Sequence, residues 1–163
     1  MDPYLAIASK RDERAYAETA IPDDVRQRIL DAGRLTGSSR NRQQWEFVVV
    51  SGSAQERLSE AVYAPENVRT AALVVAIVGE AGSFDVGRCS QNMMLAAWAD
   101  GVVSCPNGVR DAAAAAEICG GEVRAILSFG YPLRPRSPGS RTAAEWSSRA
   151  NRKPLAELVR EVS

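Results

Sequence analysis

Two groups of basic residues near opposite ends of this chain could together bind a phosphate or another anion. The first comprises Lys10, Arg11 and Arg14. The second lies within residues 134–153, which carry six basic side chains and one acidic side chain. Arginine presents a planar fork of donors to a phosphate, and lysine presents a point charge. The pattern indicates a local anion site, although arginine-rich stretches are more often ordinary solvated surface.

A polar segment at residues 36–44 separates a helical pattern from an apolar strand pattern. Its hydroxyl and amide groups can donate and accept hydrogen bonds. Such a loop is also common turn chemistry, so by itself it is a weak functional signal. The candidate binding residues in it are Ser38, Ser39, Asn41 and Gln43.

The composition excludes several kinds of chemistry. The chain of 163 residues contains no histidine, which excludes Ser-His and Cys-His catalysis and disfavours a zinc hydrolase. We therefore name no catalytic side chain and expect no metal. The 20 basic and 20 acidic residues balance, which argues against a nucleic-acid partner.

The same sequence indicates a cytoplasmic protein with no membrane partner. No apolar run approaches the roughly 20 residues that span a bilayer. Residues 1–11 lack the apolar core of a signal peptide. Cys89, Cys105 and Cys119 are odd in number and lack metal-site spacing, as is typical of reduced thiols.

The elements expected from periodicity alternate loosely between helices and strands, which predicts an α+β fold in a single domain over residues 1–163. Residues 133–148 show no periodicity, and we expect residues 134–153 to form an extended arm. Between residues 51 and 84 only one helix and one strand are evident. The predicted helices cover 3–10, 54–63, 84–99 and 110–118, with two more beginning at Pro22–Asp23 and at Pro154; the predicted strands cover 45–50, 72–78, 102–105 and 123–129, with a turn at 106–108.

Several stretches, read together and in order, resemble the nitroreductase family. Residues 10–16 resemble its opening basic motif, and residues 37–45 resemble its Pro-Ser-Ser-x-Asn-x-Gln-Pro-Trp loop before a strand. The later matches are Gln91-Asn92 with Gly101, then Phe129-Gly130-Tyr131-Pro132, and finally Asn151-Arg152-Lys153-Pro154-Leu155.

The resemblance implies a nitroreductase-like three-layer fold, with a central, mainly antiparallel sheet flanked by helices, in an intertwined homodimer. It also implies an FMN cofactor between the subunits, NADH or NADPH as donor, and a small-molecule electron acceptor such as a nitroaromatic or a quinone. By the same resemblance, Lys10, Arg11, Arg14, Arg152 and Lys153 hold the flavin phosphate, while Ser38, Ser39, Asn41 and Gln43 contact the flavin across the dimer.

The sequence also departs from the family pattern. Asp12 replaces a serine of the opening motif, and Gly37 and Gln44 replace the two prolines of the loop. The chain is also shorter than usual around the segment that covers the flavin. Three alternatives therefore stay open: a non-catalytic flavin or nucleotide binder, a family member that uses a deazaflavin or a special substrate, and an interaction protein whose basic clusters bind acidic partners.

Overall fold

The computed structural model describes residues 1–162 of the chain, which fall into two compact units. The larger unit comprises residues 11–136. The smaller unit joins residues 1–10 with residues 137–162. The boundary therefore divides the first basic cluster between Lys10 and Arg11.

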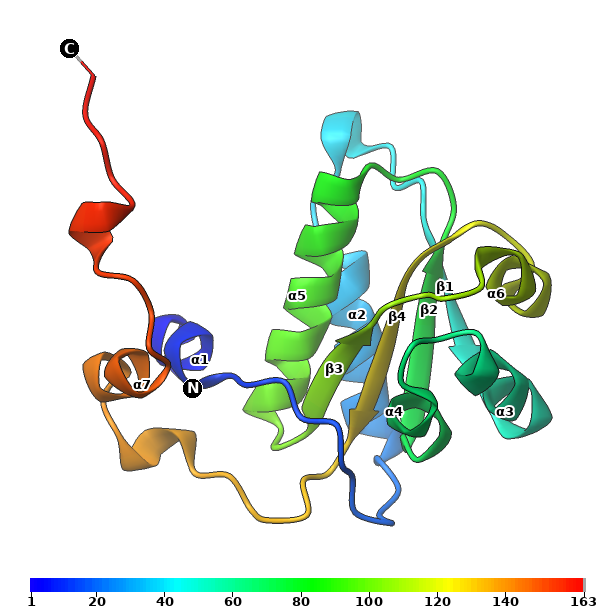
Figure 1. Cartoon of the computed structure of the whole chain (residues 1–163), viewed down its shortest axis with the longest axis horizontal. Helices are drawn as coiled ribbons and strands as arrows, with labels where there is room; N and C mark the ends of the chain where they lie inside the picture. The colour runs from blue at the N-terminus through cyan, green and yellow to red at the C-terminus, as the bar shows by residue number, and fades with distance from the viewer. Residues whose placement is uncertain (163) are drawn as a thin grey trace. The chain divides into compact units, whose positions relative to one another are not determined.

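Within residues 11–136, the fold is built on a four-stranded antiparallel sheet in the order β1-β2-β4-β3 (Figure 1). The two central strands are rich in β-branched and apolar residues, as expected for strands covered on both faces. This architecture confirms the predicted α+β class and the antiparallel sheet. The strands are β1 (Glu46–Val50), β2 (Leu73–Val78), β3 (Val103–Asn107) and β4 (Val123–Gly130).

Helices cover both faces of the sheet, so the larger unit has three layers (Figure 1). The helices α2 (Asp23–Arg34) and α5 (Ser83–Ala99) pack against one face. The shorter helices on the other face are α3 (Gly52–Glu60), α4 (Pro65–Arg69) and α6 (Ala112–Cys119). α4 is a second helix in a region where the sequence pattern revealed only one.

The main core lies between the sheet and the pair α2 and α5. Alternate residues of β2 enter this core, including Val75 and Ile77, and both are fully buried. They pack in the same cluster as Ile29 of α2 and Met93 of α5. Burial of each such side chain contributes about 1.5–3 kcal/mol. Because α5 is anchored by this core, its exposed side is a rigid platform.

Pro106 and Asn107 correct the predicted turn at residues 106–108, because both belong to β3 and pair with β4. Proline cannot donate to a ladder and is tolerated at a sheet edge. β3 is one of the two edge strands of the sheet, and it pairs with β4 over Val103–Asn107 despite the missing N–H of Pro106.

The smaller unit contains a helix, within the predicted arm of residues 134–153, that the sequence analysis did not predict. Helix α7 (Ala143–Arg149) packs against α1 (Pro3–Ser9). α7 begins with a capping box, in which the Thr142 hydroxyl accepts a hydrogen bond from the Glu145 N–H, while the Glu145 carboxylate accepts from the Thr142 N–H. The Ser/Thr-x-x-Glu pattern is a sequence signal for a helix start, and it marks this one.

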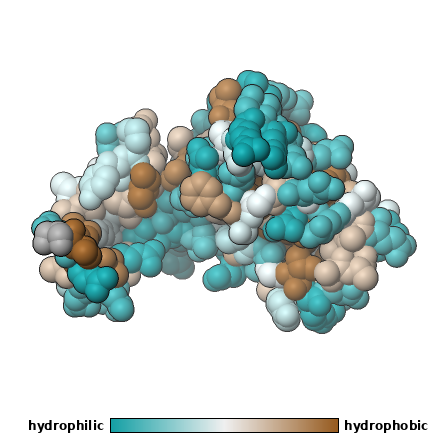
Figure 2. Space-filling view, turned by 90° about the horizontal axis from the view of Figure 1, so that it is seen from above, coloured by the Kyte–Doolittle hydropathy of each residue, from teal (hydrophilic) through white to brown (hydrophobic). Residues whose placement is uncertain are grey.

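The predicted last helix is wrong, because within residues 155–162 the chain forms only a 3₁₀ turn, Leu155–Glu157. The apolar residues that suggested it are exposed rather than packed against a core. On the face seen in Figure 2, hydrophobic residues form separate patches on a mostly hydrophilic surface. The exposed large apolar residues in the C-terminal segment are Leu155, Leu158, Val159 and Val162.

Candidate functional site

The segment that carries Arg11 and Arg14 runs beside edge strand β3. Asp12 forms a parallel bridge with Ser104, and the Glu13 N–H donates to the Ser104 carbonyl at 3.1 Å. Arg11 is half-buried and Arg14 is exposed. The backbone between these two arginines is thus held to the sheet.

Two further contacts hold this segment from its other end. Arg136 donates to both carboxylate oxygens of Glu13, at 2.6 and 2.8 Å, in the bidentate geometry that makes such pairs strong. The Ala17 N–H donates to the Tyr131 carbonyl at 2.8 Å. The chain before α2 is therefore tied to the chain that leaves β4.

Tyr16 is the buried anchor of the same segment. Its hydroxyl lies 2.8 Å from the Ser128 Oγ and donates to the Glu13 carbonyl at 3.1 Å. Burial raises the pKa of Tyr16 to about 12, because the phenolate would lose its hydration. The side chain is therefore a neutral hydrogen-bonding group at physiological pH, and its role is positional.

Next to Tyr16, a polar cluster lies under the edge of the sheet. The Asn107 amide donates to the Ser128 Oγ at 3.0 Å and to the Cys105 carbonyl at 3.1 Å. Within residues 1–162, the buried Ser104 Oγ and Asn107 Oδ1 have no hydrogen-bond partner. Buried polar atoms almost always have partners, so these two atoms are exceptions in this region.

The loop at residues 36–44 is held against helix α5 by hydrogen bonds. The Ser39 N–H donates to the Asp85 Oδ2 at 2.9 Å, and the Asn92 amide donates to the Thr36 Oγ1 at 2.7 Å. The Gln43 N–H donates to the Ser38 Oγ at 2.9 Å. These bonds fix the loop in one conformation.

That conformation is strained. Arg40, Asn41 and Gln43 have φ values of 53°, 56° and 51°, in the left-handed region that non-glycine residues rarely adopt. Asparagine tolerates this region, but arginine and glutamine do so at a cost of about 1–3 kcal/mol each. Backbone strain of this kind clusters at binding sites, which supports a functional role for the loop.

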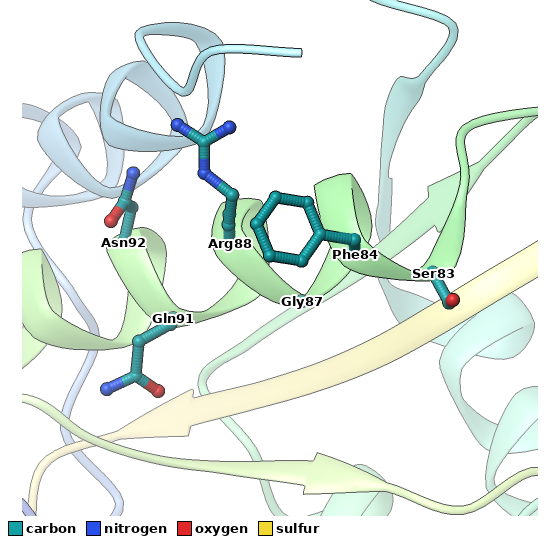
Figure 3. Close-up of a pocket in the computed structure, with 6 residues that line it drawn as sticks. All are labelled: Ser83, Phe84, Gly87, Arg88, Gln91 and Asn92. Atoms are coloured by element: carbon teal, nitrogen blue, oxygen red, sulfur yellow. The ribbon is translucent and has the colours of Figure 1, made fainter. Parts of the chain in front are cut away.

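Two hollows flank the N-terminal half of α5, and Ser83 and Gly87 line both of them. One, of about 490 Å³, lies along the exposed side of the helix (Figure 3). The other, of about 470 Å³, lies between α5 and the strands β3 and β4. Its largely apolar lining includes Val86, Met94 and Pro106. Both hollows have the size of typical small-molecule pockets.

The structure groups the predicted site residues into three sets. Arg11 and Arg14 share the segment beside β3, and the four loop residues share the strained loop. Lys10, Arg152 and Lys153 belong to the smaller unit, where the last two are exposed. Their roles toward a phosphate stay predictions.

Sequence reasoning missed several residues that shape this region. Asp85 and Arg88 were not identified, and Asn107 was assigned to a turn. The one available signal was Asp85, an acid in the first turn of a predicted helix, which is usually explained by the helix dipole alone. Only the fold shows that its carboxylate also binds the loop.

Within the part of the chain that the structure describes, no group of three or more histidine, cysteine, aspartate or glutamate residues is arranged to hold a metal ion. None of the helices over residues 1–162 has both the length and the apolar character needed to cross a membrane. The three cysteines are buried, and none of them forms a disulfide in these residues.

Comparison with known proteins agrees with the motifs. Residues 7–82 match the model of the Nitroreductase family. No curated protein matches the chain significantly.

Many solved structures share this fold. A nitroreductase family protein from Clostridium difficile has a TM-score of 0.82 at 21% identity, over 100% of this chain and 99% of its own. A protein classed as a nitroreductase, in complex with FMN, from Desulfovibrio desulfuricans has a TM-score of 0.81 at 25% identity, over 100% and 98%. The NADPH:FMN oxidoreductase from Vibrio harveyi, complexed with NAD+, has a TM-score of 0.80 at 22% identity, over 97% and 76%. The family match and these structures confirm the resemblance to the nitroreductase family and the nitroreductase fold.

Proposed function

We infer that this chain is an FMN-dependent NAD(P)H oxidoreductase that works as a homodimer on small electron acceptors such as nitroaromatics or quinones. The observation that carries this proposal is the loop at residues 37–45. It has the family's Ser-Ser-x-Asn-x-Gln pattern, and it is held in a strained conformation against α5. The family match and the FMN complex of a structural relative support the same cofactor.

The residues of the larger unit fit an FMN molecule. Arg11 and Arg14 supply donors for the phosphate. The apolar hollow beside Pro106 suits a flat ring, which would pack against its largely apolar lining. Lys10, Arg152 and Lys153 are proposed as further phosphate ligands.

When bound, FMN supplies the redox chemistry, taking two electrons from NADH or NADPH and passing them to the acceptor. In the overall reaction, NAD(P)H and one proton convert a quinone to its hydroquinone and leave NAD(P)+. The protein's part is binding and orientation: basic side chains hold the phosphate, and the strained loop presents the amides of Asn41 and Gln43. No side chain of the chain is needed as an acid or a base.

Association of two copies is part of this proposal. Four apolar residues after Pro154 are exposed with spacings of three and four residues, and a second copy of the chain could cover them. The family resemblance implies that the loop of one subunit reaches the flavin of the other. We place the enzyme in the cytoplasm, where its buried thiols would stay reduced.

The test is the visible spectrum of the purified protein with FMN, recorded without oxygen before and after addition of NADPH or NADH. We expect a bound-flavin spectrum that bleaches with at least one donor. A bound spectrum that stays yellow with both donors would identify a binding protein instead. Absence of bound flavin would refute the proposal.

A matched pair of variants assigns the phosphate ligands. Arg14→Ala should weaken FMN binding about tenfold or more, because a hydrogen bond to a charged group is lost. Arg57→Ala, on the exposed side of α3, should leave FMN affinity unchanged. Equal affinities for both variants would remove Arg14 from the proposed site.

A further inference from the structure

The hollow along the exposed side of α5 contains a cation that the proposed flavin site does not use. Figure 3 shows that Phe84, Arg88 and Asn92 lie on one side of the helix and Gln91 on the other, with Gly87 between them. Because Gly87 has no side chain and a Cβ there would meet nothing within 4 Å, the middle of the hollow is open.

Arg88 and Phe84 form a flat recognition surface. The guanidinium carbon of Arg88 lies 5.6 Å from the centroid of the Phe84 ring, in a cation–π arrangement. The ring itself is 75% exposed. A planar ligand could stack on this ring while a negative group on the ligand meets the guanidinium.

The charge of Arg88 is only partly compensated. Its nearest carboxylate, Asp85, is 4.0 Å away and already accepts the hydrogen bond from Ser39. No carboxylate is among the described residues that line the hollow. The hollow is therefore electropositive, and the side-chain amide of Gln91 also lines it.

The neighbouring loop adds to this positive charge. A Cβ on Gly37 would lie 3.2 Å from a guanidinium nitrogen of Arg88, so the loop is in close contact with this side chain. The same loop carries Arg40 and Arg42, which are exposed and make no ion pair over residues 1–162. The loop that contacts Arg88 therefore adds two further positive charges to this region of the surface.

We propose that this hollow binds a ring-bearing anionic substrate of the oxidoreductase, and that Arg88 determines the preference for negative charge. The inference rests on the proposed function, since the hollow borders the loop assigned to the flavin. A carboxylate on the electron acceptor and a phosphate on the electron donor share this chemistry, so the experiment separates them.

The test compares wild type, Arg88→Gln and the control Arg57→Gln in two half-reactions. For the acceptor, kcat/KM is measured with para-nitrobenzoate and with its neutral analogue para-nitrobenzamide. For the donor, the rate of flavin bleaching is measured with NADPH and with NADH. The nitro group is reduced to a nitroso group by one NAD(P)H and one proton, with release of water.

We expect Arg88→Gln to lower about fivefold either kcat/KM for para-nitrobenzoate or the bleaching rate with NADPH, which carries one phosphate more than NADH. The value for para-nitrobenzamide or for NADH should stay unchanged, as for loss of one partly exposed charge pair. The effect in wild type should shrink at high salt. A drop with the benzoate assigns the hollow to the acceptor, and a drop with NADPH assigns it to the donor. The inference would be overturned if Arg88→Gln lowered the rates with both acceptors equally and with both donors equally, or if it lowered none of them.

Two measurements keep this outcome separate from the proposed function. Equilibrium dialysis of para-nitrobenzoate and of NADPH against wild type and Arg88→Gln requires no turnover, so it decides on the hollow even if the flavin is never reduced. The mass in solution is measured for both proteins. If Arg88→Gln changes the mass and leaves the charge preference intact, the hollow is a subunit contact and the inference is wrong.

Discussion

The backbone of Gly130 lies directly against the ring of Tyr16. A Cβ built on Gly130 would be 2.7 Å from both the Cγ and the Cδ1 of this tyrosine, closer than real Cβ contacts allow. The glycine therefore lets the buried tyrosine cross the end of β4 and reach Ser128. This contact explains why a glycine stands at the end of β4. It also links this strand end to the segment that carries Arg11 and Arg14.

Gly130→Ala should destabilise the protein by about 1–3 kcal/mol, because the added methyl overpacks a site bounded by a buried ring. The measurement is urea unfolding. Gly87→Ala is the matched control: this glycine is exposed in the middle of α5 with no neighbour near its Cβ, so the substitution should stabilise by about 0.5–1 kcal/mol. If Gly130→Ala leaves the free energy of unfolding unchanged, the ring of Tyr16 can move aside to make room for the methyl group.

Tyr16 should make stability depend on alkaline pH. Its pKa rises from 10.0 to about 12 on folding, so the folded state holds the proton more tightly than the unfolded state. The resulting stability is complete below pH 10 and is lost as pH rises from 10 toward 12. The free energy of unfolding of wild type minus that of Tyr16→Phe should therefore fall across this window. If this difference in the free energy of unfolding does not change with pH, folding does not raise the pKa of the Tyr16 hydroxyl.

Asp85→Ala should release the loop at residues 36–44. It removes the hydrogen bond to the Ser39 N–H and one acid from the first turn of α5, at a cost of about 1–2 kcal/mol. FMN affinity should fall with it. Asp111→Ala is the control, since it removes a helix cap of similar worth from α6, where the Asp111 carboxylate accepts from Ala114. If both variants bind FMN alike, the loop is not part of the site.

Replacing the four exposed C-terminal apolar residues by serine should dissociate the proposed homodimer and leave the fold of each chain intact. These side chains are already exposed in the single chain, so their loss removes no core packing. Sedimentation should show a halved mass, and circular dichroism an unchanged spectrum. The control replaces Tyr63 and Leu133, which are also exposed, and should keep the mass of wild type. An unchanged mass in the tail variant would remove the tail from the interface. The substituted residues are Leu155, Leu158, Val159 and Val162.

The sequence was informative wherever local pattern and burial agree. The apolar run of β2 predicts a strand covered on both faces, and the core residues of α5 predict a helix against the sheet. In both cases the cause is local, so composition and spacing are sufficient to predict the element. The polar loop at residues 36–44 was identified as a candidate site through its resemblance to the family motif, and its strain is seen only in the structure.

Prediction from the sequence was wrong where tertiary contacts determine the secondary structure. Leu155, Leu158, Val159 and Val162 have helical spacing, but a short helix is marginal without a surface to pack on, and only a 3₁₀ turn forms. Pro106 suggests a turn, yet a strand at the sheet edge accommodates it. The sequence contains the capping box that starts α7. Because residues 133–148 show little periodicity, no helix was predicted there.

By itself, the sequence determined the types of binding group and the order in which the chain presents them: basic clusters, a polar loop, an apolar helix and a Gly-Tyr-Pro strand end. Only the tertiary structure decided which groups meet. Asp85 binds Ser39 across 46 positions, and Tyr16 reaches Ser128 across 112 positions. Contacts of this range depend on how strands pair and helices cross, and no local spacing encodes them.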